Sequence, residues 1–263
     1  MLIAFSMPAM AVAASGASWL TADDGAACVD GKPGRRARLN APSTFSLTLA
    51  ADDAFVPRVL AVLGIKGVSE GTAVVATTGS GDALGGNTDA GVVFRFADGT
   101  LGAWMVTAGM VSTTDVMFTI SGGGVIDIGE LVAMPAVEID IEPNWVVDDI
   151  DPTESRRTLA SQVSSVRRQA YRRFEAALSA DAVAKVRAGG LANGADWGIV
   201  RAALLGDRRG AVIPRWKHPD GGIDAAELNR TAIYGIGRLA KVRHLGGDQY
   251  GSDIAFEEVP AIP

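Results

Sequence analysis

The chain has 263 residues, of which 48% are apolar and 21% are charged, a composition that excludes wholesale disorder and supports a packed core. Its single cysteine, Cys28, excludes an intrachain disulfide framework and a thiolate-rich zinc or iron–sulfur site. Two histidines, His218 and His244, are too few for a three-histidine metal site. We therefore expect no metal and no cofactor, and we assign no catalytic, cofactor-binding or metal-binding residue.

The net charge of −6 is unevenly divided along the chain. Residues 1–150 carry 17 acidic and 7 basic side chains, a net of −10, whereas residues 151–263 carry 13 and 17, a net of +4. The composition changes near a proline-containing acidic stretch, which is typical of a connector. We therefore predict a domain at 1–142, a linker at 143–152 and a second region at 153–263. A net of +4 is mild for a nucleic-acid-binding region, so we expect no such partner.

The first fourteen residues are almost wholly apolar and end in Ala11-Val12-Ala13-Ala14. This run resembles a secretory signal with a small-residue cleavage site near Ala14, although no Lys or Arg precedes it. The other interpretation is a buried strand at Leu2–Phe5, followed by a loop and another strand. The run is too short to span a membrane, and we expect no membrane span elsewhere.

Short apolar or alternating segments recur through the first half, bounded by glycines and turn residues. They predict strands at Phe45–Leu49, Arg58–Gly64, Thr72–Thr78, Val92–Phe96, Leu101–Val106 and Val116–Ile120. Asp98-Gly99 is a strong hairpin signal between two of them. This spacing, without an amphipathic helix between the strands, predicts an antiparallel β-sandwich or jelly roll. Gly79–Gly86 is not followed by a helix, so we interpret it as a surface loop and not as a phosphate-binding loop.

The second half begins with a helical pattern. Asp151-Pro152-Thr153-Glu154 resembles a helix start. Apolar residues then recur at spacings of three and four, at Leu159, Val163, Val166, Ala170, Phe174 and Leu178. We therefore predict a long amphipathic helix, further helix from Asp181 to Gly189, a short helix over Asp196–Leu205, and strands to the end of the chain. The predicted fold class is mainly β with an α+β carboxy-terminal part.

The order of features in residues 1–140 resembles the discoidin-type, galactose-binding-like jelly roll found in many phage tail proteins. The resemblance rests on a small-residue strand, a basic turn and the strands that follow, at Ala14–Ser18, Asp30–Arg38, Phe45–Leu49, Ala51–Arg58 and Val59–Gly64. Family members often carry a tryptophan just after the basic turn, where this chain has Leu39-Asn40. Sugar binding does not follow from the fold, and we transfer no ligand residues.

The end of the chain is also similar to phage tail proteins. The similar features are the turn His244-Leu245-Gly246-Gly247, Tyr250, the strand around Ile254 and Phe256, and the segment Ile213–Trp216. The resemblance implies a non-enzymatic structural protein of a phage tail tip or baseplate. Its expected partners are other tail proteins and copies of itself in a homo-oligomeric ring, and its expected location is the virion.

Two alternatives stay open: a carbohydrate-binding module that recognises host surface glycans, and a secreted bacterial β-rich protein. Exposed aromatic rings would favour the module, and the tryptophans of the first half are Trp19, Trp104 and Trp145. Arg35, Arg36 and Arg38 are candidates for an anion or saccharide site, against a solvated or salt-bridged turn. Adjacent acids, at Asp23-Asp24, Asp148-Asp149 and Glu257-Glu258, point in different directions and make no glycosidase pair by themselves.

Overall fold

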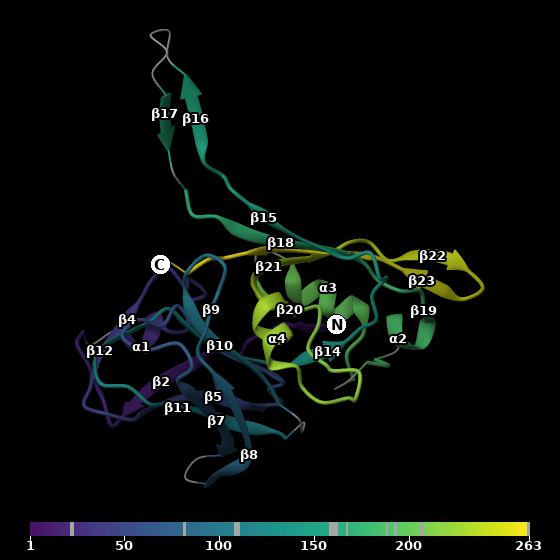
Figure 1. Cartoon of the computed structure of the whole chain (residues 1–263). Helices are drawn as coiled ribbons and strands as arrows, with labels where there is room; N and C mark the ends of the chain where they lie inside the picture. The colour runs from purple at the N-terminus through teal and green to yellow at the C-terminus, as the bar shows by residue number, and fades with distance from the viewer. Residues whose placement is uncertain are drawn as a thin grey trace.

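The computed structural model describes the chain except residues 22–23, 81–82, 108–110, 158–162, 167, 188, 192–193, 206–207 and 262–263. Within the described residues the fold is mainly β, as expected, with six antiparallel sheets and four short helices. Figure 1 shows a hairpin that projects far from the remainder of the molecule. No helix in the described ranges has the length and apolar character needed to cross a membrane.

Two sheets form a sandwich in the first half of the chain. The outer sheet has five strands, in the order β2 (Met10–Ser15), β5 (Phe45–Phe55), β11 (Thr113–Ile120), β7 (Ala73–Ser80) and β8 (Ala83–Val92). The inner sheet has four strands, in the order β13 (Glu130–Met134), β6 (Val59–Leu63), β10 (Leu101–Val106) and β9 (Phe94–Arg95). The predicted β-sandwich is therefore present.

A third and larger sheet joins strands from both halves of the chain. Its seven strands run in the order β14 (Ala136–Glu138), β1 (Leu2–Ala4), β20 (Arg209–Ile213), β21 (Ile233–Leu239), β24 (Asp253–Glu258), β18 (Tyr171–Ala177) and β15 (Val146–Ile150). Ile3 is opposite Val137 on one side and Val212 on the other. Residues 1–142 and 153–263 thus share one sheet, and the division of the chain into two domains stays a prediction.

The remaining strands form three small sheets. One contains β12 (Gly124–Ile128), β4 (Ala37–Ala41) and β3 (Ser18–Trp19). A second contains β19 (Asp181–Ala182), β23 (Gln249–Gly251) and β22 (Arg243–Gly246). The third is the projecting hairpin of β16 (Glu154–Arg157) and β17 (Val163–Val166).

The helices are α1 (Asp24–Ala27), α2 (Val183–Arg187), α3 (Trp197–Leu204) and α4 (Ala225–Thr231). The predicted short helix over Asp196–Leu205 is confirmed as α3, and Asp196 caps it by accepting a hydrogen bond from the backbone N–H of Ile199 at 2.9 Å. The predicted helix from Asp181 to Gly189 is confirmed over α2 and is wrong at Asp181–Ala182, which form β19. Asp224 caps α4 in the same way, through the N–H of Glu227.

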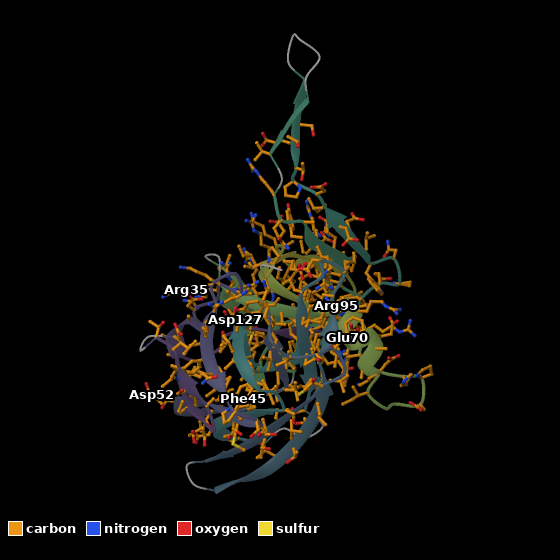
Figure 2. The ribbon with its side chains drawn as sticks, turned by 60° about the vertical axis from the view of Figure 1, so that its left-hand side comes forward. Arg35, Phe45, Asp52, Glu70, Arg95 and Asp127 are labelled. Atoms are coloured by element: carbon orange, nitrogen blue, oxygen red, sulfur yellow. The ribbon has the colours of Figure 1, made fainter. Side chains whose placement is uncertain are left out.

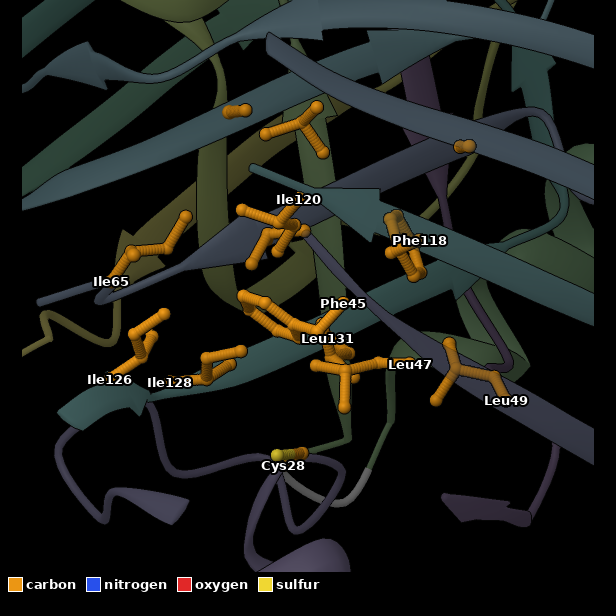
Figure 3. Close-up of a cluster of buried hydrophobic side chains, with 14 of the residues drawn as sticks. Cys28, Phe45, Leu47, Leu49, Ile65, Phe118, Ile120, Ile126, Ile128 and Leu131 are labelled. Atoms are coloured by element: carbon orange, nitrogen blue, oxygen red, sulfur yellow. The ribbon is translucent and has the colours of Figure 1, made fainter. Parts of the chain in front are cut away.

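Three hydrophobic clusters hold the layers together. The first lies inside the sandwich and includes Phe45 and Leu47 of β5 and Phe118 of β11 (Figure 3). The second lies between the four-stranded and seven-stranded sheets, and the third between the seven-stranded sheet and helices α2 and α3. Strand β6 is buried at all five positions because its residues alternate between the first two clusters, which accounts for its continuous apolar sequence.

The prediction of a long amphipathic helix after residue 153 is wrong. The described residues of this segment form β16, β17 and β18, while Leu159 lies outside them. In β18 the buried side chains are Phe174 and Ala176, a period of two, and Leu178 continues the alternation. Phe174 and Leu178 are four residues apart, a spacing that fits both one turn of a helix and two two-residue repeats of a strand, so it does not distinguish the two.

Three other predictions, for the linker, the glycine-rich loop and the amino-terminal segment, can be compared with the observed strands. The predicted linker at 143–152 contains β15, which pairs with β18, and the linker bounds, like the domain division, stay a prediction. The interpretation of Gly79–Gly86 as a surface loop is wrong where it can be compared: residues 79–80 belong to β7 and residues 83–86 to β8, while residues 81–82 lie outside the described residues. The amino-terminal segment forms β1 and β2, in agreement with the strand interpretation of Leu2–Phe5.

Candidate functional site

A cleft of about 530 Å³ lies where β9, β15 and α4 meet. Phe94 of β9 and Phe96, in the turn between β9 and β10, form one side of it, and Trp145, immediately before β15, forms another. All three rings are partly exposed. Arg230 and Glu227 of α4 bring charged groups to the same space. The volume is within the range of small-ligand pockets.

The hairpin that carries the two phenylalanines is fixed by hydrogen bonds within its turn. Gly99 adopts a positive φ of 83°, a conformation that glycine adopts readily, and its N–H donates to the carbonyl of Phe96 at 2.9 Å. The Asp98 carboxylate accepts hydrogen bonds from the N–H and the hydroxyl of Thr100, at 2.9 and 2.7 Å. The predicted hairpin at Asp98-Gly99 is thus confirmed. It places the rings of Phe94 and Phe96 with centroids 6.1 Å apart.

Trp145 is held from one side by the hydrophobic core. Its ring centroid lies 6.2 Å from that of Phe174, at an interplanar angle of 45°. Phe174 is fully buried in the cluster beneath the seven-stranded sheet, whereas Trp145 only packs against that cluster. One part of the indole is therefore anchored, and another part remains available to the cleft.

Arg172 fixes the base of the cleft through contacts with three groups. Its guanidinium forms an ion pair with Glu258, and both side chains are only 13% exposed. It also donates hydrogen bonds to the carbonyl oxygens of Arg230 and Ala232, at 3.0 and 2.9 Å. These bonds connect β18 to α4 and leave Arg172 with its donors engaged. The exposed carboxylate of Asp149, opposite Arg172 in the sheet, is available to a ligand.

Polar groups on the opposite wall are also held in place. Arg230 forms an ion pair with Glu227 one turn earlier in α4, at 3.0 Å. Arg95 donates to the carboxylate of Glu70 and to the carbonyl of Gly99, at 3.3 and 3.2 Å, and Figure 2 shows Arg95 and Glu70 close together. The cleft therefore combines three partly exposed aromatic rings with charged groups of both signs. This arrangement suits a neutral polar ligand that has an apolar face.

The basic turn predicted as a candidate anion or saccharide site makes contacts within the chain. Arg38 forms two hydrogen bonds to the Asp127 carboxylate, at 2.6 and 2.9 Å, and this pairing lowers the pKa of Asp127. Arg35 pairs with Asp30 at 3.3 Å. Figure 2 shows Arg35 and Asp127 on the same side of the sandwich. The buried Nε and Nη2 atoms of Arg36 have no hydrogen-bond partner among the described residues.

Of the three tryptophans considered in the first half, only Trp145 lines the cleft. Trp104 is 2% exposed inside the molecule, and Trp19 packs against the sandwich core. His218 lies 3.5 Å from the Asp224 carboxylate, and His244 packs against Tyr250 with ring centroids 5.2 Å apart. These histidines contact different elements and do not line the cleft.

The adjacent acids do not form a glycosidase pair in the part of the chain that the structure describes. Glu258 pairs with Arg172, whereas the neighbouring Glu257 is exposed and opposite Arg173 in the sheet. Asp148 and Asp149 alternate along β15, and Asp23 lies outside the described residues. Within the described residues no group of three His, Cys, Asp or Glu side chains is arranged to hold a metal ion.

A second polar cluster lies deep between the layers. The carboxylate of Glu130 is fully buried, and its Oε1 atom accepts hydrogen bonds from the Gly31 N–H at 3.2 Å and the Tyr234 hydroxyl at 3.5 Å. Its Oε2 atom has no partner among the described residues. Burial raises the pKa of Glu130 to about 8, and burial also raises the pKa of Tyr234. Arg209 donates to the carbonyl of Gly31 at 2.9 Å on the opposite side.

Comparison with protein-family models and with curated proteins finds no match. Among solved structures, the chain is similar to the family 32 carbohydrate-binding module of Clostridium perfringens NanJ in complex with galactose. That likeness has a TM-score of 0.36 and 15% sequence identity, and it covers 47% of this chain and 93% of the module. The chain is also similar to another C. perfringens module, CpGH89CBM32-5, in complex with GalNAc-β-1,3-galactose. There the TM-score is 0.33 and the identity 17%, with 47% and 94% of the two chains covered. The comparisons thus show structural similarity to family 32 carbohydrate-binding modules over about half of this chain.

Proposed function

We propose that this protein binds a carbohydrate in the cleft formed by Phe94, Phe96 and Trp145, without catalysing its breakdown. Sugar rings present apolar C–H faces, which pack on aromatic side chains, and hydroxyls, which accept and donate hydrogen bonds. The cleft offers partly exposed rings from two segments and charged groups from β15 and α4. The three converging rings are the observation that carries the proposal.

The test is a glycan array followed by calorimetry on the whole chain. Galactose and GalNAc-β-1,3-galactose belong among the arrayed sugars, because they are the ligands in the two similar structures. Replacing Trp145 with Ala is expected to weaken binding by at least about tenfold, or about 1.4 kcal/mol. Tyr250→Ala is the matched control, because that ring packs against His244 and Arg187, outside the cleft.

Trp145 also contacts the core, so Trp145→Ala could lose binding by destabilising the fold. A second variant, away from the core, separates the two effects. Asp149→Asn removes a charge from an exposed strand position and leaves the packing intact. It is expected to weaken sugar binding while the thermal unfolding temperature changes little. Binding that survives both changes, or hydrolysis of the bound glycan by the pure protein, would contradict the proposal.

A second candidate function is assembly, and the projecting hairpin favours it. A two-stranded hairpin is at best marginally stable alone in water, yet β16 and β17 extend away from the molecule (Figure 1). Val166 on this hairpin is 58% exposed. Contact with a neighbouring subunit would stabilise both strands. We propose that the hairpin joins this chain to copies of itself or to other subunits, and a phage tail tip or baseplate is the assembly that the sequence resemblance names.

Light scattering after size-exclusion chromatography tests the assembly proposal. The wild-type chain is expected at a multiple of its 27.1 kDa mass. Val166→Asp places a charge on the hairpin and is expected to shift the protein toward the monomer. A wild-type chain that stays monomeric across the concentration range would exclude self-assembly and leave only unlike subunits as partners.

A further inference from the structure

A groove of about 920 Å³ crosses the seven-stranded sheet beside α3. Residues from β15, β18, β24 and β21 line it, and so does the carboxy-terminal end of α3. Four neighbouring strands span roughly 14 Å in the direction across the sheet, at about 4.8 Å between strands. The groove is separate from the aromatic cleft, and the two share no lining residue.

The apolar surface of the groove is aliphatic. Ile254, Leu239 and Ala176 come from the sheet, and Leu204 and Leu205 come from α3. Leu205 is 57% exposed, a large exposed fraction for a leucine beside an apolar groove. The described lining residues include no aromatic ring, so the groove has no stacking platform for a sugar or a nucleic-acid base.

The charges of the groove are not balanced. Its acidic residues, Glu175 and Asp253, already form ion pairs with Arg173 and Arg243. Arg201 and Lys241 line the same groove, and neither has an ion-pair or hydrogen-bond partner among the described residues. Both also line an adjoining hollow of about 370 Å³ toward α2, so they lie at the junction of a longer depression. This end of the groove is therefore cationic.

An amphipathic helix would fit the part of the groove that α3 leaves uncovered. Helix α3 is eight residues long and covers only part of the sheet, whereas layered folds cover an apolar sheet face with adjacent helices. A helix of about ten residues is about 15 Å long, close to the span of the four strands. Leucine-type side chains would meet the aliphatic surface, and carboxylates would meet Arg201 and Lys241.

We propose that this groove is a docking site for an acidic amphipathic helix of a partner protein. The probe is a synthetic peptide of about 14 residues with leucines at i, i+3, i+4 and i+7 and glutamates elsewhere. Fluorescence anisotropy with the full chain is expected to show saturable binding that weakens as salt increases. The double variant Arg201→Glu/Lys241→Glu is expected to weaken it by at least about tenfold.

Controls separate this proposal from simpler explanations. Arg215→Glu reverses an exposed charge outside the groove and is expected to leave peptide binding unchanged. A peptide with lysines in place of the glutamates is expected not to bind. Glycan binding is expected to be the same in the double variant as in the wild type, so failure of one proposal is distinguishable from failure of the other.

Four binding results would overturn the proposal. These are no binding of the acidic peptide, equal binding of the basic peptide, binding that the double variant retains, and stronger binding of a single-stranded DNA oligomer. A concentration-dependent mass increase that the double variant abolishes would also overturn it, because the occupant would then be a second copy of this chain.

Discussion

The buried carboxyl of Glu130 should make the stability of this protein fall as the pH rises. Its side chain is fully buried between the layers, with Oε1 hydrogen-bonded and Oε2 without a partner in the described residues. The perturbation is Glu130→Gln, compared with the wild type across the pH range. Glutamine keeps an oxygen that accepts from the Gly31 N–H and removes the ionisation.

The sign of this pH dependence follows from the number of protons that the folded and unfolded states bind. In the unfolded chain the carboxyl ionises near its ordinary pKa of 4.5, whereas in the folded protein burial raises the pKa to about 8. Between these values the folded protein binds the extra proton, so its free energy of unfolding decreases as the pH increases. Below 4.5 both states are protonated and the group has no effect, while above about 8 both are ionised and the loss is complete. A change from 4.5 to about 8 corresponds to a loss of about 5 kcal/mol, taken as an upper figure.

The assay is denaturant unfolding followed by tryptophan fluorescence at intervals from pH 5 to pH 9. The difference between Glu130→Gln and the wild type isolates this group, because all other titrations are common to both proteins. The variant should become the more stable protein progressively toward pH 9. Glu70→Gln, at a half-exposed surface carboxylate, serves as the control and should follow the wild type. Parallel curves for Glu130→Gln and the wild type would refute the reasoning.

Three further predictions concern single contacts. Burial raises the pKa of the Cys28 thiol to about 12, so a thiol reagent should leave it unmodified in the native protein and react after denaturation, as read by mass. Glu258→Gln leaves the buried guanidinium of Arg172 without its carboxylate, and should lower the free energy of unfolding by about 3–5 kcal/mol in denaturant titrations. Gly235→Ala would place a Cβ atom 1.9 Å from the carbonyl oxygen of Glu257, and should lower the melting temperature because backbone in β24 must shift; an unchanged melting temperature would show that the strand pairing there is looser than described.

The strands of the sandwich could be predicted from the sequence because their environment is uniform. Leu101–Val106 matches the prediction at both ends, and Val59–Leu63 is recognisable as a fully buried run. Both strands lie between two layers, so the apolar signal is continuous and the bounding glycines end it. Local sequence and tertiary structure agree at these positions.

The segment after residue 153 could not be predicted, because its pattern fits two periods. Phe174 and Leu178 satisfy a helix and a strand equally, and the alternation of Phe174 with Ala176 is weak because alanine contributes little hydrophobic signal. The pairing of β18 with β15 and β24 decides the outcome, and those partners are distant in the sequence. Tertiary context therefore overrides the local helical pattern.

The sequence predicts only part of the candidate cleft. Trp145 is one of three tryptophans in the first half, and the sequence pattern does not distinguish it from Trp19 or Trp104. Phe94 and Phe96 are two residues apart and so lie on one side of a predicted strand beside the Asp98-Gly99 turn, a pattern that indicates paired rings. Their approach to Trp145 depends on how the layers stack, and no local pattern encodes that.

Strand β1 has a practical consequence for dividing the molecule. It lies between β14 and β20, so separating residues 1–142 from 143–263 removes two strands from the seven-stranded sheet and exposes the edge of β20. An apolar edge of that kind invites aggregation, and the separated second part should precipitate. A short peptide with the sequence of residues 1–5, added in trans, should cap that edge and restore solubility, as a donated strand does. The first five residues should therefore act as a strand that a separate peptide can replace.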